Sequence, residues 1–235
     1  MGKTGKVDGS MSWKRPLRMI ALAAVAVLGI AADTPWHATV AVSERAHTIG
    51  NPAAEVTLTE FVSYSCPHCA TFAMQGDPAL QIAYIGTGKV KVEVRPVIRN
   101  SIDTVATLLA QCGDSDRFIR NHAMFMRTQR GWLPVAQRAT QARVARWTAA
   151  DKPAARRAIA NDLGFYALME SRGYSRVDID QCLADDAKAD RLEANSEADF
   201  EQFGVTSTPS FAIDGKLLDH VHEWKSLETK LNERF

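Results

Sequence analysis

The sequence Cys66-Pro67-His68-Cys69 combines residue types and a spacing that could perform thiol chemistry. Two residues between the cysteines allow Cys69 to reach back and form a small disulfide with Cys66. His68, which stands inside the pair, can add positive charge and a hydrogen-bond donor. The motif therefore predicts two cysteines that exchange a disulfide with another thiol.

The motif lies between a predicted strand and a predicted helix. The preceding run, residues 55–65, is rich in β-branched and aromatic residues and follows the turn signal Asn51-Pro52. Pro67 suits the first turn of a helix, which places Cys66 at the helix N-terminus. Unpaired N–H groups and the helix dipole stabilise an anion there. We therefore expect Cys66 to have a lowered pKa and to react as a thiolate.

Three other uses of the motif fit the sequence less well. A zinc site would need a second pair of ligands, but the chain holds no second Cys-x-x-Cys, and His220 and His222 are only two positions apart. A haem attachment site requires a histidine directly after the second cysteine, where Ala70 stands. An inert structural disulfide is the third alternative. We predict no metal and no cofactor besides the cysteine pair itself.

Other segments complete an α/β pattern around the motif. Residues 89–97 alternate valine with charged residues, which predicts a second strand. A helix joins this strand to the first, so we expect the two strands to be parallel. Residues 209–218 predict a hairpin with a tight turn at Asp214-Gly215, and residues 223–234 predict a closing helix.

A helical block interrupts this pattern. Residues 101–202 are rich in Ala, Arg, Leu, Asp and Glu, and Ser101 and Asp103 suit the N-cap and first turn of its first helix. We predict helix breaks or caps at Gly131, Pro134, Pro153 and Gly173. The α/β unit then consists of residues 51–100 and 203–235, with residues 33–50 as a linker or N-terminal strand.

The first 32 residues have the pattern of an export signal. Basic residues precede an uncharged run of about 14 residues from Met19 to Ala32, and small residues close it. The run is shorter than the roughly 20 residues that span a bilayer comfortably. We predict a signal peptide or an N-terminal membrane anchor, and export of the rest of the chain to the periplasm.

The overall composition is that of a globular protein. Of the 235 residues, 46% are hydrophobic and 23% are charged, which excludes disorder of the whole chain. Lys and Arg number 28 and Asp and Glu 27, giving a net charge of +1. The basic footprint of a nucleic-acid-binding protein is therefore absent from the sequence.

Cys112 and Cys182 form a second pair, 70 positions apart. In an oxidising compartment, two remaining cysteines are expected to bond to each other and to stabilise the helical block. Free buried thiols and a redox relay with other cysteines are the alternatives.

The motif in its setting resembles the DsbA-like thiol:disulfide oxidoreductases. The segments Thr59–Cys69 and Gly204–Pro209, together with the helical block, carry the resemblance, which covers about residues 47–235. It implies a thioredoxin fold with an inserted α-helical domain. It also implies that Cys66 is an exposed nucleophile, that Cys69 is its buried partner and that His68 stabilises the thiolate.

The resemblance assigns roles to further residues. Pro209 matches a cis-proline that faces the disulfide and helps to bind extended substrate. Thr208 precedes it, where the best-known oxidases carry valine, whereas isomerases and some other DsbA-like proteins carry threonine. Glu60 matches an acid that handles protons near the buried cysteine together with a lysine, for which Lys91 is the candidate. A surface-facing position for Glu60 and a solvated Lys91 are the alternatives.

The leading functional hypothesis is an exported enzyme that introduces disulfides into reduced or unfolded exported proteins. The resemblance implies a membrane quinone-linked reoxidase of the DsbB type as a partner. A disulfide isomerase or reductase is the second hypothesis, which Thr208 motivates. A non-catalytic metal- or peptide-binding module of the same fold is the third.

Overall fold

The two valine-rich segments form the centre of a six-stranded sheet. β3 (Val56–Val62) and β4 (Val90–Pro96) run parallel. They are connected by α1 (Pro67–Gln75), α2 (Asp77–Leu80) and the π-helical turn η2 (Gln81–Ile85). The predicted parallel pair joined through helices is confirmed. This computed structural model describes Gly2, Gly5 and residues 34–235, so the predicted export segment lies almost entirely outside the described residues.

Antiparallel strands extend the sheet on both sides, in the order β1-β2-β4-β3-β5-β6. After the short turn η1 (Trp36–Ala38), β1 (Val40–Val42) and β2 (His47–Ile49) line up beside β4. The stretch expected to be a linker or an N-terminal strand therefore contains two strands.

The predicted hairpin follows on the other side of the sheet. β5 (Ser210–Ile213) pairs with β3, and β6 (Lys216–Leu217) pairs with β5. Asp214 and Gly215 connect them with φ of 50° and 80°. Such left-handed backbone is easiest for Gly, Asn and Asp, which is why Asp-Gly is a strong hairpin signal.

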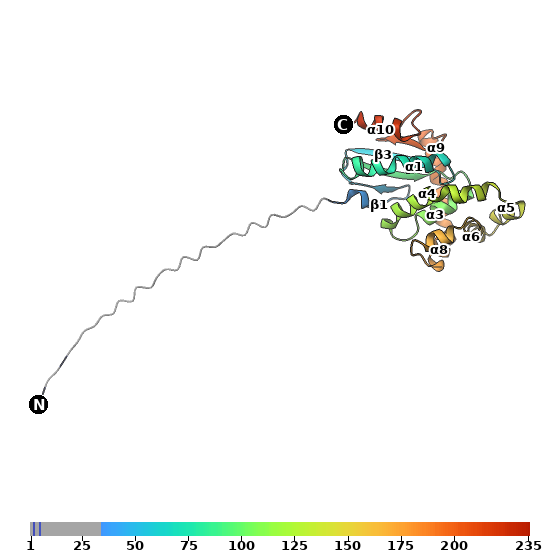
Figure 1. Cartoon of the computed structure of the whole chain (residues 1–235), viewed down its shortest axis with the longest axis horizontal. Coiled ribbons are helices and arrows are strands. Elements are labelled where there is room, and N and C mark those ends of the chain that lie inside the picture. The colour runs from blue at the N-terminus through green and yellow to red at the C-terminus, as the bar shows by residue number, and fades with distance from the viewer. Residues whose placement is uncertain (1, 3–4, 6–33) are drawn as a thin grey trace. The chain divides into compact units, whose positions relative to one another are not determined.

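Seven α-helices lie between β4 and β5, and α10 (Trp224–Asn232) closes the chain. In Figure 1, α5, α6 and α8 lie on the side of the molecule away from α10. The helices of this block and one short 3-10 turn are α3 (Ser101–Ala110), η3 (Ser115–Arg117), α4 (Phe118–Gln137), α5 (Gln141–Trp147), α6 (Lys152–Asp162), α7 (Phe165–Glu170), α8 (Arg176–Ala184) and α9 (Asp186–Phe203).

Two local expectations for this block are wrong. Helix α4 continues through Gly131 and Pro134, where we expected breaks. Its buried face, which includes Phe125 and Trp132, packs in the core, and such tertiary packing outweighs the roughly 3 kcal/mol that an interior proline costs. The N-cap of α3 is Asn100 and not Ser101, because the Asn100 side chain accepts hydrogen bonds from two first-turn N–H groups.

The two faces of the sheet belong to different clusters. Even-numbered positions of β3 and β4, such as Leu58 and Val92, contribute to the main core together with α1, α3 and α4. Phe61 and Ala212 lie in a second, smaller cluster, against which Phe203 of α9 packs. Residues 34–235 form one compact unit. Among the described residues, no helix has the length and apolarity needed to cross a membrane.

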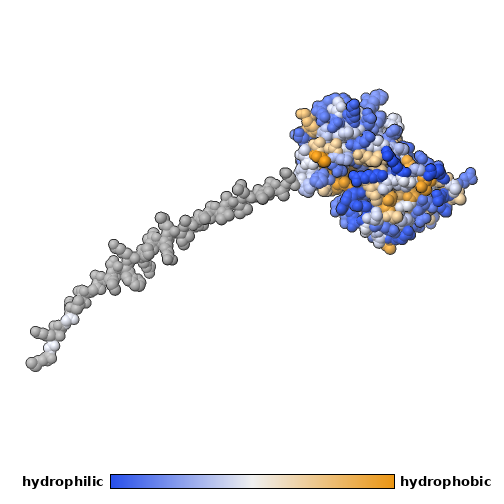
Figure 2. Space-filling view, viewed as in Figure 1, coloured by the Kyte–Doolittle hydropathy of each residue, from blue (hydrophilic) through white to orange (hydrophobic). Residues whose placement is uncertain are grey.

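Large exposed apolar side chains are few and scattered over different elements. They are Val42, Met74, Ile82, Val144, Val177, Phe200 and Phe235. On the face seen in Figure 2, apolar patches alternate with hydrophilic residues. Single exposed apolar residues are ordinary for a soluble surface and identify no binding face by themselves.

Candidate active site

Cys66 is the N-cap residue of α1. Its backbone is extended, with φ of −90° and ψ of 118°, and Pro67 follows in the first turn of the helix. The Cys66 carbonyl already accepts the first helical hydrogen bond, from the Ala70 N–H at 3.3 Å. The predicted position of Cys66 at a helix N-terminus is confirmed, and the helix dipole there favours a negative charge on its sulfur.

The two cysteines are free thiols in this structure and differ in acidity. A hydrogen bond with the Cys69 side chain, aided by the Thr208 side chain and by the backbone N–H groups of Cys69 and His68, lowers the pKa of Cys66 to about 5 against the opposing effect of burial. Burial and the neighbouring Cys66 raise the pKa of Cys69 well above its usual range. At neutral pH, Cys66 is therefore the thiolate and Cys69 keeps its proton.

One expectation about Cys66 is wrong: it is not exposed. Its exposed fraction is 3%, against 0% for Cys69, so both cysteines are buried. The cause is the loop before β5, because its Thr208 carbonyl oxygen lies 3.1 Å from the Cys66 sulfur and accepts a hydrogen bond when Cys66 is protonated. Pro67 and His68, by contrast, lie at the surface. An incoming thiol must therefore reach the sulfur at the edge of this loop.

His68 contributes to the site through its backbone. Its N–H is one of the groups that lower the pKa of Cys66. Its imidazole is exposed and makes no hydrogen bond within the described part of the chain. A role of the imidazole itself in stabilising the thiolate stays a prediction.

The loop that faces Cys66 contains the predicted cis-proline. The peptide bond between Thr208 and Pro209 is cis. The Ser210 hydroxyl donates to the Ser207 carbonyl at 2.8 Å, and Nδ1 of His222 donates to the Pro209 carbonyl at 2.8 Å. These bonds fix the loop itself, and the Thr208 carbonyl oxygen lies 3.1 Å from the sulfur of Cys66 at the start of α1.

Asp103, at the start of α3, fixes the loop that leads into Cys66. Its buried carboxylate accepts hydrogen bonds from the Ser63 hydroxyl at 2.9 Å, from the Ser65 N–H at 2.8 Å and from the Ser65 hydroxyl at 3.0 Å. The Arg99 N–H donates to it as well, at 3.1 Å. From the sequence, Asp103 was recognised only as a first-turn residue, since nothing local shows that its carboxylate is buried against the motif.

Gln129, in the middle of α4, is a second residue that the sequence did not indicate. Its Nε2 donates to the Tyr64 carbonyl at 2.7 Å and to the Cys66 carbonyl at 2.8 Å. Its side chain is buried. Two helices of the inserted block, α3 and α4, therefore hold the backbone from Ser63 to Cys66.

Glu60 lies on the motif side of the sheet and Lys91 does not. Glu60 is 3% exposed and pairs with Val94 in the register of β3 and β4. Lys91 pairs with Thr57 on the opposite face, and its Nζ donates to the Pro52 carbonyl at the surface, at 3.1 Å. Since successive strand residues point to opposite faces, the expectation that Lys91 is the partner of Glu60 is wrong.

The groups that share the surroundings of Glu60 are Asp77 and His122. Together with apolar side chains they line a cavity of about 30 Å³, which is large enough for a water molecule. Burial, and then the charge of Asp77, raise the pKa of Glu60 well above its usual range. Burial also raises the pKa of Asp77 to about 7, although Arg127 opposes this. Burial therefore favours the protonated form of Glu60.

Two histidines are buried in this region, and one of them, His122, lines the cavity. Nδ1 of His122 is 2.9 Å from the Tyr64 hydroxyl, and the His47 ring stacks on Phe118 with centroids 4.1 Å apart. Burial lowers the pKa of both histidines to about 4, aided by Lys188 for His47 and by His47 for His122. Both imidazoles are therefore neutral in the folded protein at neutral pH.

We expect these histidines to make the fold acid-sensitive. A base whose pKa falls from 6.5 in the unfolded chain to about 4 on folding stabilises the fold fully above pH 6.5. That contribution, at most about 3 kcal/mol per histidine, is lost as pH falls from 6.5 to 4. The measurement is the free energy of unfolding against pH for wild type and His47→Phe. The difference between the two should change over this window.

His37→Phe is the matched control, because it removes an exposed imidazole. The raised pKa of Asp77 gives a pH dependence of the opposite sign in wild type and variants alike, so it cancels in the comparison. The difference reports His47 together with the part of the His122 titration that depends on it. Parallel curves for wild type and His47→Phe would contradict the expectation.

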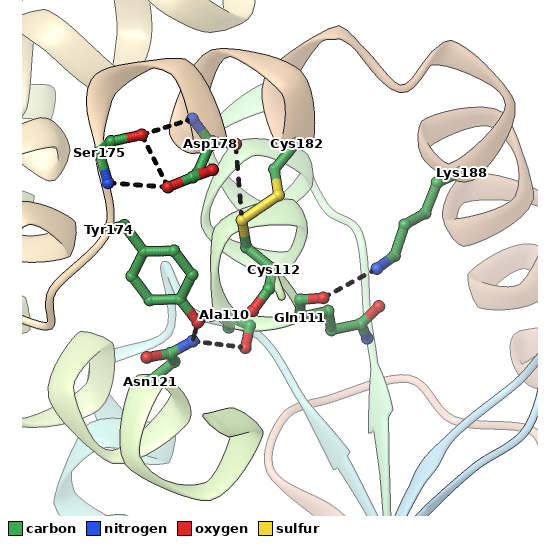
Figure 3. The surroundings of a disulfide bond; sticks show 9 residues. All are labelled: Ala110, Gln111, Cys112, Asn121, Tyr174, Ser175, Asp178, Cys182 and Lys188. Atoms are coloured by element: carbon green, nitrogen blue, oxygen red, sulfur yellow. Dashed lines mark hydrogen bonds between the residues drawn. A yellow bond between two sulfur atoms is a disulfide. The ribbon is translucent and has the colours of Figure 1, made fainter. Parts of the chain in front are cut away.

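The second cysteine pair is a disulfide, as predicted. Cys112 follows α3 and bonds to Cys182 in α8, with their Cα atoms 5.8 Å apart. The Tyr174 hydroxyl donates to the Cys112 carbonyl at 2.7 Å, and Asn121 donates to that hydroxyl at 2.8 Å. Figure 3 shows these groups around the bond. The end of α3 is thus fixed covalently and by hydrogen bonds to α8 and α4.

Comparison with known proteins agrees with this geometry. Residues 42–233 match the family model described as Thioredoxin. A Rickettsia typhi protein that is named, by inference, a protein-disulfide oxidoreductase is 30% identical over 71% of this chain and 54% of its own length. The chain therefore spans about half the length of that curated relative.

Solved structures agree as well. A protein-disulfide isomerase from Novosphingobium aromaticivorans is 39% identical, with a TM-score of 0.79 over 82% of this chain and 98% of that one. Wolbachia pipientis α-DsbA1 is 17% identical, with a TM-score of 0.63 over 85% of this chain and 95% of that one, and shows the fold alone. The predicted α/β thioredoxin fold with inserted helices is confirmed.

Proposed function

Because the chain belongs to the thioredoxin family, we propose that it is a protein-disulfide oxidoreductase that introduces disulfides into exported proteins through Cys66 and Cys69. The observation that carries this proposal is the unequal acidity of the pair: the pKa of Cys66 is about 5, and that of Cys69 is far higher. A stabilised Cys66 thiolate favours the reduced form of the pair. Its disulfide is then an oxidant.

The reaction begins with the Cys66–Cys69 disulfide. A substrate thiolate attacks the sulfur of Cys66, the Cys66–Cys69 bond breaks, and Cys69 leaves with the electron pair. A second substrate thiolate then attacks the substrate sulfur of the mixed disulfide and releases Cys66 as a thiolate. The substrate has lost two electrons and formed a disulfide, and the cysteine pair has gained those electrons. The burial of Cys69 requires that its departing sulfur be protonated.

Glu60 is the proposed proton donor for Cys69. It lies on the same side of the sheet, it is close enough for its ionised form to raise the pKa of Cys69, and burial raises its own pKa, which favours the protonated form that can donate. One proton passes from the Glu60 carboxyl to the Cys69 sulfur, and solvent afterwards restores the proton on Glu60. Asp77, which is less buried, lines the same cavity.

We expect Glu60→Gln to slow reduction of the Cys66–Cys69 disulfide by a small dithiol by about 10²-fold, the scale of general acid catalysis. It should also stabilise the fold at alkaline pH. Because folding raises the pKa of Glu60, wild type loses stability as pH rises toward that pKa, and the substitution removes the titrating group. Lys91→Met, on the opposite face, is the matched control. Equal rates for wild type and Glu60→Gln would remove Glu60 from the mechanism.

A disulfide isomerase is the second candidate, because Thr208 stands where isomerases carry threonine and the Novosphingobium aromaticivorans relative is named a protein-disulfide isomerase. Two assays separate the candidates. An oxidase forms disulfides in a reduced, unfolded protein and shows an oxidising equilibrium with glutathione. An isomerase rescues a scrambled multi-disulfide protein, for which a reduced Cys66 is required. Rescue of the scrambled protein without net oxidation of the reduced one would overturn the oxidase proposal.

The proposed place of action is the periplasm. The pattern of residues 1–32 supports export, with an N-terminal anchor as the alternative to cleavage. The proposed substrates are reduced or unfolded exported proteins. After each turnover the pair must be reoxidised, and the proposed partner is a membrane quinone-linked reoxidase of the DsbB type. Cell fractionation tests the location, because an exported chain that has been cleaved is released with the periplasmic fraction. The N-terminal sequence of the released chain then distinguishes cleavage from an N-terminal anchor.

A further inference from the structure

Arg99 connects the inserted block with the loop that faces Cys66. It lies between β4 and α3, where its backbone N–H donates to Asp103. Its side chain is exposed, and Nη1 donates to the Thr208 hydroxyl at 3.4 Å. Thr208 in turn contacts Cys66, both through its carbonyl and as a side-chain hydrogen-bond partner.

The chemistry of the two side chains decides what this contact does. A guanidinium only donates hydrogen bonds, whereas a hydroxyl has one hydrogen to donate and lone pairs that accept. A hydroxyl that accepts from Arg99 keeps its own hydrogen for another acceptor. The sulfur of the Cys66 thiolate, with which the Thr208 side chain makes a hydrogen bond, is such an acceptor.

We infer that Arg99 is a positioning residue, which orients the Thr208 hydroxyl so that it donates to the sulfur of Cys66. The inference deepens the proposed function and rests on it, since a better-stabilised thiolate makes the disulfide a stronger oxidant. Arg99 acts through Thr208, and no contact between its guanidinium and the sulfur is needed.

Other ionisable groups around Cys66 could also shift its pKa, so the test must leave them unchanged. They are Cys69 and His68 on α1, Asp103 on α3, and Glu60 on β3. None of them is altered by a change at Arg99 or Thr208. Arg99→Met keeps the backbone N–H that donates to Asp103 and removes only the guanidinium.

The test is a double-mutant cycle on the titration of Cys66, followed by the ultraviolet absorbance of the thiolate in the reduced protein. Losing one hydrogen bond to a charged sulfur should raise the pKa of Cys66 by about 0.5–1 unit in Arg99→Met. The equilibrium with glutathione should become about three- to tenfold less oxidising. In the Thr208→Val background, Arg99→Met should change neither quantity.

Two outcomes would overturn the inference. An equal shift from Arg99→Met with and without the Thr208 hydroxyl would mean that the guanidinium acts as a remote charge. No shift in either background would mean that the contact does not matter. Arg138→Met, which removes an exposed arginine at the end of α4, is the matched control. The thiolate titration needs no turnover, so failure of the oxidase assays and failure of this inference are distinguishable.

Discussion

Cys66→Ser is expected to reduce the oxidation of a dithiol substrate to the rate measured without the protein. Serine at neutral pH offers neither a thiolate nor a sulfur that can form a disulfide, so no exchange step can begin. Because Cys66 is the N-cap of α1 and serine is a favoured N-cap residue, the variant should keep its fold. Substrate oxidation, followed by loss of free thiols, measures the effect.

Cys69→Ser should fail at a different step. Cys66 remains a thiolate, although its pKa should rise because the Cys69 side chain makes the largest contribution to lowering it. Offered a substrate that already contains a disulfide, this variant should form a mixed disulfide that accumulates, since no internal thiol resolves it. Mass spectrometry of the trapped adduct should place the substrate on Cys66.

The two variants together separate catalysis from a binding role of the same fold. If the cellular or biochemical function of the chain persisted in Cys66→Ser, the thiol would be dispensable and a non-catalytic peptide- or metal-binding module would be favoured. If the adduct in Cys69→Ser formed at another position, the assignment of Cys66 as nucleophile would be wrong. A Cys112→Ala/Cys182→Ala background excludes exchange with the second pair.

The sequence predicts well what is local in this protein. The position of Cys66 at a strand–helix junction, the two central strands and the Asp214-Gly215 hairpin each depend on neighbouring residues. The cysteine pairing of the inserted block also follows from simple counting, once the motif has claimed the other two cysteines.

What depends on the relative placement of distant elements could not be predicted. Gln129 reaches the carbonyl of Cys66 from α4, 63 positions away, and Asp103 accepts from Ser65 across 38 positions. No periodicity marks either contact. Lys91 was misassigned for a simpler reason: it differs by one position from the face that holds Glu60, and one position in a strand reverses the side chain.

The second large effect concerns stability. Replacing both Cys112 and Cys182 by alanine is expected to lower the free energy of unfolding by about 4 kcal/mol. The bond closes a loop of 70 positions, and its loss gives that entropy back to the unfolded chain. Urea unfolding at neutral pH measures the change. Both cysteines are replaced because a single change would leave a reactive thiol.

The position of α3 makes this variant informative about the active site as well. The first turn of α3 contains Asp103, which holds the loop before Cys66, and the chain just after the C-terminal end of α3 is tied to α8 by the disulfide. The hydrogen bonds of Asp103 and the Tyr174 contact with the Cys112 carbonyl remain in the double variant. We therefore expect the folded variant to oxidise substrate at the wild-type rate at low temperature and to lose activity at a lower temperature than wild type.

A redox relay makes the opposite prediction. If electrons passed from Cys66–Cys69 to Cys112–Cys182, the double variant would turn over more slowly than wild type even at low temperature, where it stays folded. Cys112→Ser/Cys182→Ser supplies the matched comparison for packing, because Cys112 is buried and serine adds a hydroxyl there. Similar losses in the alanine and serine pairs would assign the effect to the missing cross-link. A loss confined to the serine pair would assign it to the buried hydroxyl, and the disulfide would then contribute little to holding the inserted helices.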